Sequence, residues 1–333
     1  MNIIISAVLG TVVLAILSII FGLLISGVDR KISARMQARV GPRIIQPFID
    51  VMKLFSKQSI VPENAVKWLF NLMPIAALAS AVAILLYLPF GSIAPILGGS
   101  GDIILILYLL LMPSLAMVIG GFASGSPYAS IGAQREMVSM IAFELPLAFA
   151  AILIVWRLMV SGVTDPFAMT TLMEVSVWDA AGPLGIAGCI ILLFLFAWIT
   201  PGEISKVPFD TPEAETELAG GILSEYSGRN LGMFTLSQAV KTIAISAFGV
   251  AVLLPWNLSP VLGLSGVAAA AVDLLFFAAK LLVVLVLSVT LIRTMTARLR
   301  ITQVVKLNWF IFGLLSAAAM ILFIADAAVM GVI

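Results

Sequence analysis

Five carboxylates crowd into one short segment that lies between two apolar runs. The segment Phe209–Gly228, FDTPEAETELAGGILSEYSG, holds five of the 17 acidic residues of the chain: Asp210, Glu213, Glu215, Glu217 and Glu225. Carboxylates beside or inside a bilayer are costly, and membrane proteins retain them mainly to handle protons or other ions. This acidic segment therefore points to energy coupling in a membrane.

Helical spacing within the acidic segment would place some of its carboxylates on one face. Thr211 is suited to be an N-cap and Pro212 the first residue of a helix, which sets Glu213 and Glu217 on the same face. Glu225 falls roughly on that face again. Because no base accompanies these acids, their pKa values should spread and some should rise towards neutrality. The alternative is a solvated acidic loop, which suits the Ala, Gly and Leu content of the segment less well.

A further carboxylate, Glu144, lies inside an apolar run, in the sequence MIAFELPLAFA. A charged residue at the centre of a membrane helix costs about 2.5–3.5 kcal/mol on insertion scales. Pro146 frees a backbone carbonyl nearby, and Glu136 lies close to the same helical face, beside Arg135. This arrangement predicts a proton relay. The alternative is that Glu144 is the structural partner of a buried base.

Two lysines, Lys241 and Lys280, also lie inside apolar runs. Each is expected to pair with a carboxylate or to act on the charge of one nearby, as charged residues within membrane segments do. We predict that Lys280 lies near the middle of the bilayer. Asp273 and Asp326 are predicted nearer the outer ends, as interface residues.

The elements that position these residues are membrane helices. The chain is 62% hydrophobic and 11% charged, whereas soluble domains carry about 25% charged residues. We therefore predict an all-α membrane protein with about eight transmembrane helices in a single polytopic domain, residues 1–333. The apolar runs long enough to span, at roughly 20 residues each, are about 3–27, 67–90, 103–123, 136–160, 183–201, 232–254, 267–292 and 307–331. The first run lacks a basic leader and a cleavage site, and is expected to be a retained helix.

Basic residues concentrate in alternate loops, at about 29–66, 124–135, 202–231 and 293–306, whereas the other loops hold only Arg157. Basic loops stay on the cytoplasmic side of a membrane. We therefore predict a multi-pass protein of the cell membrane with these four loops in the cytoplasm and both termini outside. The bases concerned are Arg30, Lys31, Arg35, Arg39, Arg43, Lys53, Lys57, Lys67, Arg135, Lys206, Arg229, Arg293, Arg298, Arg300 and Lys306.

The first basic loop contains apolar residues at helical spacing after a break at Gly41-Pro42. Phe48, Val51, Met52, Leu54 and Phe55 group on one face. This pattern predicts an amphipathic helix that lies in the membrane interface. The alternative is a basic loop that only sets the orientation of the chain.

The sequence has few residues that could bind a redox cofactor: it contains one cysteine, Cys189, and no histidine. No cluster of either type exists to hold zinc, haem or an iron–sulfur cluster. We expect this chain to bind no metal or other cofactor and to have no catalytic residue. Any redox centre would then belong to partner subunits.

Five sequence stretches carry a resemblance over nearly the whole chain. They are RKISARMQARVGPRIIQP, DVMKLFSKQSIVP, SPYASIGAQREMVSMIAFELPL, VPFDTPEAETELAGGILSEYSG and RTMTARLRITQVVK. In this order they resemble the H-type membrane subunit of respiratory complex I, where it forms the quinone chamber, and of the energy-converting nickel–iron hydrogenases. Complex I members usually have a longer first loop than GPRIIQP, Lys-Glu where this chain has Lys57-Gln58, and Lys in place of Pro127. These departures resemble the hydrogenase branch, and the acidic segment resembles complex I. The combination is similar to the membrane-bound hydrogenases and sulfane reductases of anaerobic archaea.

The resemblance implies a membrane-anchor and coupling subunit that links electron transfer in a peripheral redox arm to proton or sodium translocation. It implies a nickel–iron hydrogenase-like large subunit, iron–sulfur subunits and antiporter-like membrane subunits as partners. The implied coupling residues are Glu144, Asp210, Glu213, Glu215, Glu217 and Glu225, to which Glu136, Lys241 and Lys280 are added from their positions. Docking or charge partners are expected at Arg35, Arg39, Arg43 and Arg135.

Three other functions stay open. The first is the quinone chamber of an NADH- or deazaflavin-linked quinone or phenazine oxidoreductase, and only there would a quinone bind. The second is the membrane subunit of a sulfane reductase. The third is a stand-alone cation/proton transporter, a class that often shows inverted repeats, of which we find none. Nucleic acid is not an expected partner, because the bases follow the orientation rule.

Overall fold

Long helices dominate the computed structural model of the chain, which describes residues 2–98 and 102–331 and contains no β-strand among them. Eight helices in this part are long and apolar enough to cross a membrane, which confirms the predicted fold class. Residues 1, 99–101 and 332–333 of the predicted domain lie outside the described residues. The uninterrupted long helices are α1 (Asn2–Met36), α3 (Lys67–Leu86), α4 (Ile103–Ala123), α5 (Pro127–Val160), α8 (Pro183–Glu203) and α10 (Gly228–Leu253).

The last two spans are each interrupted by a stretch of π-helix. One runs through α12 (Gly266–Leu285), η2 (Val286–Thr290) and α13 (Leu291–Met295), and the other through α14 (Ile301–Lys306), η3 (Leu307–Phe312) and α15 (Gly313–Val329). Both η2 and η3 are π-helical. The short elements are α2 (Gln46–Ser56), α6 (Met169–Glu174), α7 (Val177–Ala180), α9 (Glu215–Leu218), η1 (Gly221–Leu223) and α11 (Ser259–Leu262).

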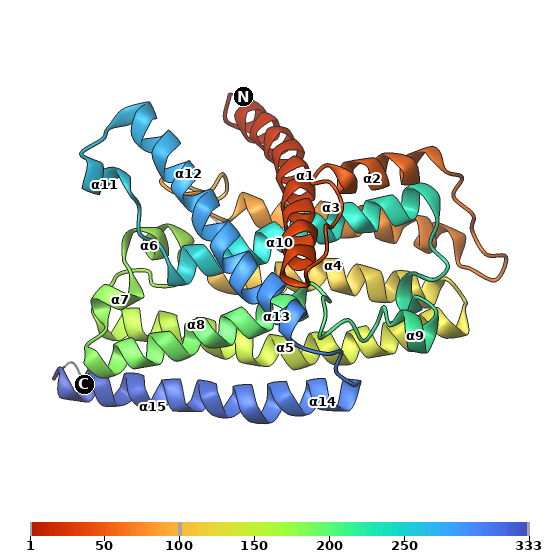
Figure 1. The fold of residues 1–333 in the computed structure, drawn as a ribbon. Helices are drawn as coiled ribbons and strands as arrows, with labels where there is room; N and C mark the ends of the chain where they lie inside the picture. Colours follow the sequence, from red (N-terminus) through yellow and green to blue (C-terminus); the bar gives the residue numbers. More distant parts are fainter. Residues whose placement is uncertain (1, 99–101, 332–333) are drawn as a thin grey trace.

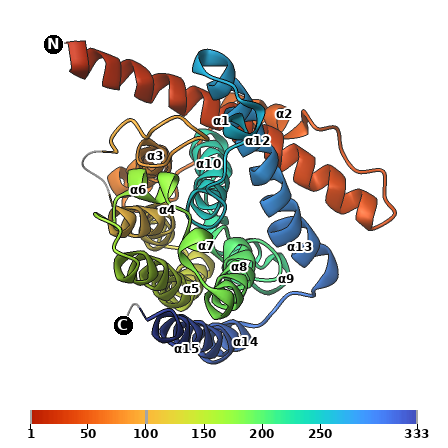
Figure 2. The same ribbon diagram turned by 90° about the vertical axis from the view of Figure 1, so that its left-hand side faces the viewer.

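Six helices form a bundle with their axes roughly aligned, and two further helices cross it. Helices α3, α4, α5, α8, α10 and α15 lie side by side and are seen nearly end-on in Figure 2, whereas α1 and α12 run across them (Figures 1 and 2). Helix α10 is the centre, since 89% of its most apolar window is buried. Gly249 lets it approach α8, because a Cβ there would overlap the Phe196 ring. Small residues permit such close packing between membrane helices.

Several predicted limits of the spans differ from the structure. Helix α5 begins at Pro127 and not near residue 136, so Arg135 lies on a helix and not in a loop. Pro127 stands at the start of a helix, where its missing N–H costs nothing. Helix α1 likewise continues to Met36, past the predicted start of the first basic loop. The predicted helix of that loop is confirmed as α2, which buries Pro47 and Val51.

At the end of the bundle away from the acidic segment, an ion pair that the sequence did not predict holds α15. Arg157 of α5 donates a hydrogen bond to Asp326 of α15 at 2.8 Å, and both side chains are 1% exposed. Asp326 also accepts a hydrogen bond from the backbone N–H of Gly182, just before α8. The interpretation of Arg157 as a loop base was therefore wrong, because it lies within helix α5.

Asp273 and Lys280 of α12 organise the connection between α10 and α12. Asp273 is fully buried and accepts hydrogen bonds from the backbone N–H groups of Leu258 and Ser259. Lys280 donates to the carbonyl oxygens of Leu254 and Trp256, each at 2.7 Å. Among the described residues it pairs with backbone carbonyls and not with a carboxylate.

Candidate functional site

A buried ion pair forms the inner part of the candidate site, where α4, α8 and α10 meet. Lys241 of α10 lies 3.1 Å from Oε2 of Glu203 at the end of α8, and the two side chains are 5% and 3% exposed. The Lys241 ammonium also donates to the Ser114 hydroxyl of α4 at 2.8 Å. Glu144 of α5 interacts electrostatically with both Glu203 and Lys241. The lysine thus pairs with one carboxylate, Glu203, and its charge also acts on a second, Glu144.

Two carboxylate oxygens of this inner cluster accept no hydrogen bond from the described residues. Oε2 of Glu144 and Oε1 of Glu203 are buried and have no hydrogen-bond partner among the described residues. A buried polar atom without a partner costs free energy, and it is retained where function needs it. These oxygens are therefore free to accept a proton or a water molecule.

A second layer connects the inner cluster to the acidic segment. Glu136 of α5 is buried and accepts hydrogen bonds from Ser205 at 3.2 and 3.3 Å. It interacts electrostatically with Lys241 on one side and with Glu213 on the other. Gln238 of α10 donates to Glu213 at 2.7 Å, so one turn of α10 contacts the acidic segment and the next turn carries Lys241.

Glu213 and Lys206 form a coupled pair just outside the membrane helices. Burial raises the pKa of Glu213 above its ordinary value, although the Lys206 ammonium and the Gln238 hydrogen bond act in the opposite direction. Burial also lowers the pKa of Lys206, and Glu213 is the neighbour that opposes this most strongly. Both groups are thereby pushed towards their neutral forms. A proton passes between such groups more readily than between ordinary surface residues.

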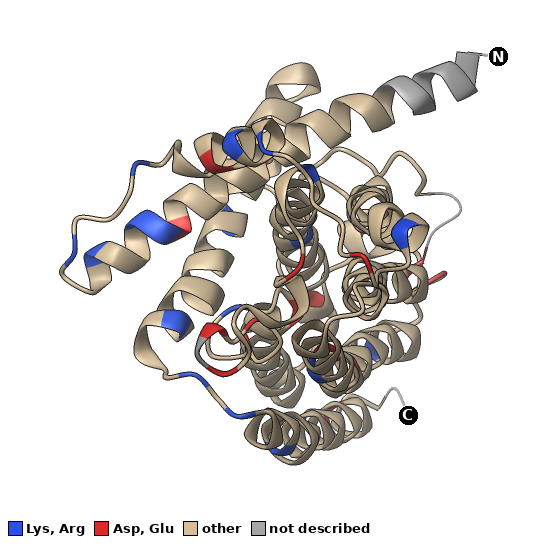
Figure 3. Cartoon of the chain, turned by 90° about the vertical axis from the view of Figure 1, so that its right-hand side faces the viewer, with Lys and Arg blue, Asp and Glu red and all other residues tan. Residues whose placement is uncertain are grey.

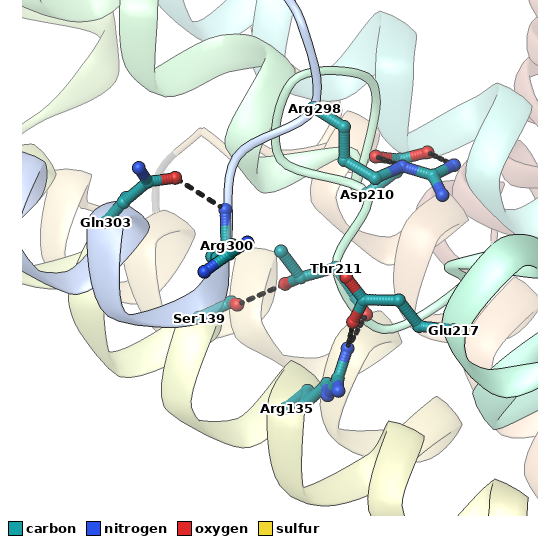
Figure 4. Close-up of polar contacts among 8 residues, drawn as sticks. All are labelled: Arg135, Ser139, Asp210, Thr211, Glu217, Arg298, Arg300 and Gln303. Carbon is teal, nitrogen blue, oxygen red and sulfur yellow. Dashed lines mark hydrogen bonds and ion pairs between the residues drawn. The ribbon is translucent and has the colours of Figure 1, made fainter.

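The outer layer consists of ion pairs that hold the acidic segment from two sides (Figure 4). Arg135 of α5 pairs with Glu217, whose carboxylate therefore has a lowered pKa. On the other side, Arg298 binds Asp210 through two nitrogen atoms. Figure 3, which views the molecule from this end, shows basic stretches towards its edge and acidic ones nearer its middle.

The acidic segment does not form the helix that its spacing predicted. Thr211 is no N-cap, because its hydroxyl lies 3.3 Å from that of Ser139 and its carbonyl oxygen accepts from Arg135. Its helical parts are the short α9, Glu215–Leu218, and the 3-10 turn η1, Gly221–Leu223. Glu213 points towards α10 whereas Glu217 points towards α5. Gly221, at φ +54°, turns the chain back so closely that a Cβ would overlap the Pro212 carbonyl oxygen.

A cavity of about 110 Å³ lies beside this layer, between α1, α2, α10 and α12–η2. Its lining combines polar residues, among them Asp29, Lys206, Gln238 and Thr290, with apolar ones such as Leu23. Such a mixed lining suits an amphipathic group. The cavity shares Lys206 and Gln238 with the acidic segment, so an occupant would touch the charged line directly.

Comparisons with known proteins identify the family of this chain. A family described as NADH dehydrogenase matches residues 9–324. The chain belongs to this family. Formate hydrogenlyase subunit 4 of Escherichia coli is 32% identical over 290 residues, 87% of this chain and 90% of that protein. Hydrogenase-4 component C of the same organism is 30% identical over 298 residues, covering 89% of each chain.

Other members of the NADH dehydrogenase family match over less of their length. An NADH-quinone oxidoreductase subunit of Koribacter versatilis is 30% identical over 252 residues, 72% of this chain and 58% of that protein. Among solved structures, a chain of the membrane-bound sulfane sulfur reductase, an archaeal respiratory membrane complex, superposes with a TM-score of 0.80. It is 25% identical, and the match covers 97% of this chain and all of the other.

Sequence reasoning missed Glu203 in this member of the family. Glu203 follows directly on an apolar run whose predicted end was residue 201, so it was counted as part of a loop. Helix α8 instead continues through Pro201 to Glu203, which buries the carboxylate beside Lys241. The available signal was its place just beyond the run, opposite a lysine that had no assigned partner.

The structure does not bring all predicted site residues together. Glu215 is exposed and Glu225 half-buried, and in the described part of the chain neither side chain forms a hydrogen bond or ion pair. Lys280 lies apart, at the connection between α10 and α12. The predicted docking arginines are exposed at the end of α1 and in the link to α2: Arg35, Arg39 and Arg43.

Proposed function

We propose that this chain is the membrane-anchor and coupling subunit of a multi-subunit oxidoreductase of the membrane-bound hydrogenase type. It links electron transfer in a peripheral arm to translocation of protons or sodium. The observation that carries this proposal is the continuous line of interacting charges from the acidic segment to the interior of the helices. The line consists of Asp210, Glu213, Glu136, Lys241, Glu203 and Glu144.

The line offers a way to move a charge effect inward without a bound cofactor. A change of charge on the peripheral arm would alter the protonation of Glu213, which burial has already brought towards neutrality. Glu136 responds because Glu213 acts on it directly, and Lys241 then balances Glu136 against Glu203 and Glu144. Groups that interact this strongly titrate together and not one by one. The partnerless oxygen of Glu144 is the inner end of this line.

Two comparisons support the hydrogenase branch over the complex I branch. The matches to formate hydrogenlyase subunit 4 and hydrogenase-4 component C cover 90% and 89% of those proteins. The match to the Koribacter NADH-quinone oxidoreductase subunit covers 58%. The proposed partners are a nickel–iron large subunit, iron–sulfur subunits and antiporter-like membrane subunits. The proposed setting is the cell membrane, with both termini outside and with Arg35, Arg39 and Arg43 facing the arm.

Glu144→Gln in the assembled complex tests the proposed function. We expect electron transfer to continue and the number of ions translocated per electron pair to fall, because the inner end of the line loses its titratable group. The matched control is Glu174→Gln, which makes the same change at an exposed site at the end of α6. Ion translocation that is intact in a normally assembled Glu144→Gln complex would refute the proposal.

A second function, the quinone chamber of a complex I-type enzyme, is favoured by the cavity between α1, α2, α10 and α12. Analysis of the purified complex by mass spectrometry, with metals and quinone measured in the same sample, separates the candidates. Nickel with iron and no quinone supports the hydrogenase type, and iron alone supports a sulfane reductase. Bound quinone with flavin supports the chamber. A chain that purifies without partners and transports ions alone would be a transporter.

A further inference from the structure

The link between the last two spans, residues 296–300, holds the acidic segment at two consecutive positions. The backbone N–H of Leu299 donates to the carbonyl oxygen of Pro208 at 3.0 Å. Arg298 Nε donates to Asp210 Oδ1 at 2.9 Å, and its Nη2 donates to the other oxygen. A bidentate arginine–carboxylate pair fixes direction as well as distance. Position and orientation of residues 208–210 are therefore both set by the link (Figure 4).

We propose that Arg298 is a positioning residue that clamps the acidic segment in its coupling-competent place. This inference rests on the proposed function, because it assigns a regulator to the same charged line. Arg298 binds Asp210 and acts through it.

The clamp also controls charge at the start of the line. The negative charge of Asp210 acts on Glu213 and opposes its ionisation. As long as Arg298 neutralises Asp210, this opposition is small; once the clamp is lost, a second bare carboxylate faces Glu213. The charged groups that act on Glu213 include Lys206, Glu215, Glu136 and Asp210, and Arg298 is bound to Asp210. Loss of the clamp therefore changes both the place and the charge environment of Glu213.

The helices on both sides of the link can transmit its movement. The π-helical segments η2 and η3 lie one short α-helical turn away on either side, at Val286–Thr290 and Leu307–Phe312. Such segments hold an extra residue per turn and are frequent at functional sites. Converting one to α-helix shifts the following residues by about 1.5 Å and rotates them by roughly 100°. Thr290 of η2 donates to Asp29 of α1 at 2.7 Å, so the clamp is connected to α1 as well.

The clamp differs from the other ion pair of the segment. In the pair of Arg135 with Glu217, the carboxylate side chain is 47% exposed, whereas Asp210 is 13% exposed. Exposed ion pairs contribute little to stability. Arg300, on the same link, is exposed, and its backbone N–H donates to the Gln303 side chain. Arg300→Gln therefore removes a neighbouring positive charge and leaves that bond and the clamp in place.

The test uses the whole complex and follows the place of the segment separately from coupling. Ala214 is 1% exposed, so a cysteine there is labelled by a maleimide only when the segment is released. In an Ala214→Cys background with Cys189→Ser, we compare Arg298→Gln, Arg298→Lys, the swap Arg298→Asp with Asp210→Arg, and the control Arg300→Gln. The second readout is the number of ions translocated per electron pair.

We expect Arg298→Gln to raise the labelling rate about tenfold, which corresponds to about 1.4 kcal/mol, and to lower the ion-to-electron ratio. Arg298→Lys, which keeps the charge but loses the two-point bond, should lie in between. The swap should restore both readouts, and Arg300→Gln should change neither. If Arg298→Gln does not assemble, Arg298→Lys decides in the same assays.

Two results overturn the clamp: an unchanged labelling rate, or an increased labelling rate with an unchanged ion-to-electron ratio. The reference variant Glu144→Gln separates this inference from the function on which it rests. If Glu144→Gln uncouples the complex and the Arg298 variants do not, only the clamp is wrong. If Glu144→Gln leaves coupling intact, the proposed function itself is wrong.

Discussion

The pair of Lys241 and Glu203 allows stability and coupling to be separated in one experiment. The proposed variants are Lys241→Met, Glu203→Gln and the two combined. Either single change leaves one charge buried without its partner. Glu203→Gln leaves the Lys241 ammonium with the Ser114 hydroxyl at 2.8 Å. Lys241→Met leaves the Glu203 carboxylate with the like charge of Glu144 acting on it. The double variant leaves no charge of this pair. Methionine and glutamine keep most of the volume, so packing changes little.

The magnitude follows from the geometry. Two unit charges 3.1 Å apart attract each other by about 5 kcal/mol at an effective dielectric constant near 20. Removing one partner of a buried ion pair costs about 3–5 kcal/mol, whereas replacing both with neutral groups is often close to neutral. We therefore expect each single variant to be strongly destabilised and the double variant to be nearly as stable as the natural chain.

The assay combines thermal unfolding of the purified complex with ion translocation in vesicles. The double variant should recover the unfolding temperature but not the ion-to-electron ratio, because the lysine no longer balances the carboxylates. The reasoning fails if the double variant is destabilised by the sum of the two single changes, since the pair would then contribute no interaction energy. It also fails if the double variant couples normally.

Three further outcomes are expected. Asp326→Asn should lower stability by about 3–5 kcal/mol by leaving Arg157 buried and unpaired, as measured by thermal unfolding, with the ion-to-electron ratio of the assembled complex unchanged. Gly221→Ala should displace the acidic segment and lower that ratio. Gly220→Ala introduces backbone strain at φ +97° but meets only the Ser224 Cα, at 3.9 Å, and should lower the ratio less; equal effects would count against the close approach. Because burial raises the pKa of Glu213 above 4.5, the packed segment binds a proton that the released segment loses, so packing should weaken as pH rises from about 4.5. The cysteine labelling assay, read against an exposed reference cysteine, should show this trend, and Glu213→Gln should remove it.

Features that depend on local sequence were predictable. Apolar runs of sufficient length became the eight spans, and the spacing of apolar residues after Gly41-Pro42 became helix α2. The position of the acidic segment between two spans was also predicted. These features follow from hydrophobicity and periodicity within a window of the chain.

Features that depend on contacts between distant residues were not predictable. Arg157 and Asp326 are separated by 169 positions, and the sequence around each residue gives no indication that the two form a pair. Glu203 was missed because a helix that continues through a proline has no sequence mark, and its partner Lys241 lies on another span. The acidic segment was given a helix because Thr211-Pro212 is a sound helix start, but contacts of Thr211 with α5 outweighed that propensity.

The central position of α10 bears on how the protein is made. Its surface is covered by neighbours and carries Lys241, Gln238 and several serines, and it is the least apolar of the eight spans. On insertion scales, such a helix enters a bilayer only weakly by itself. Helices α3 and α4, which pack against it, are synthesised earlier. If α3 and α4 are already in the membrane, α10 can pack against them as it inserts. Helix α10 would then insert together with a group of helices and not as a separate span.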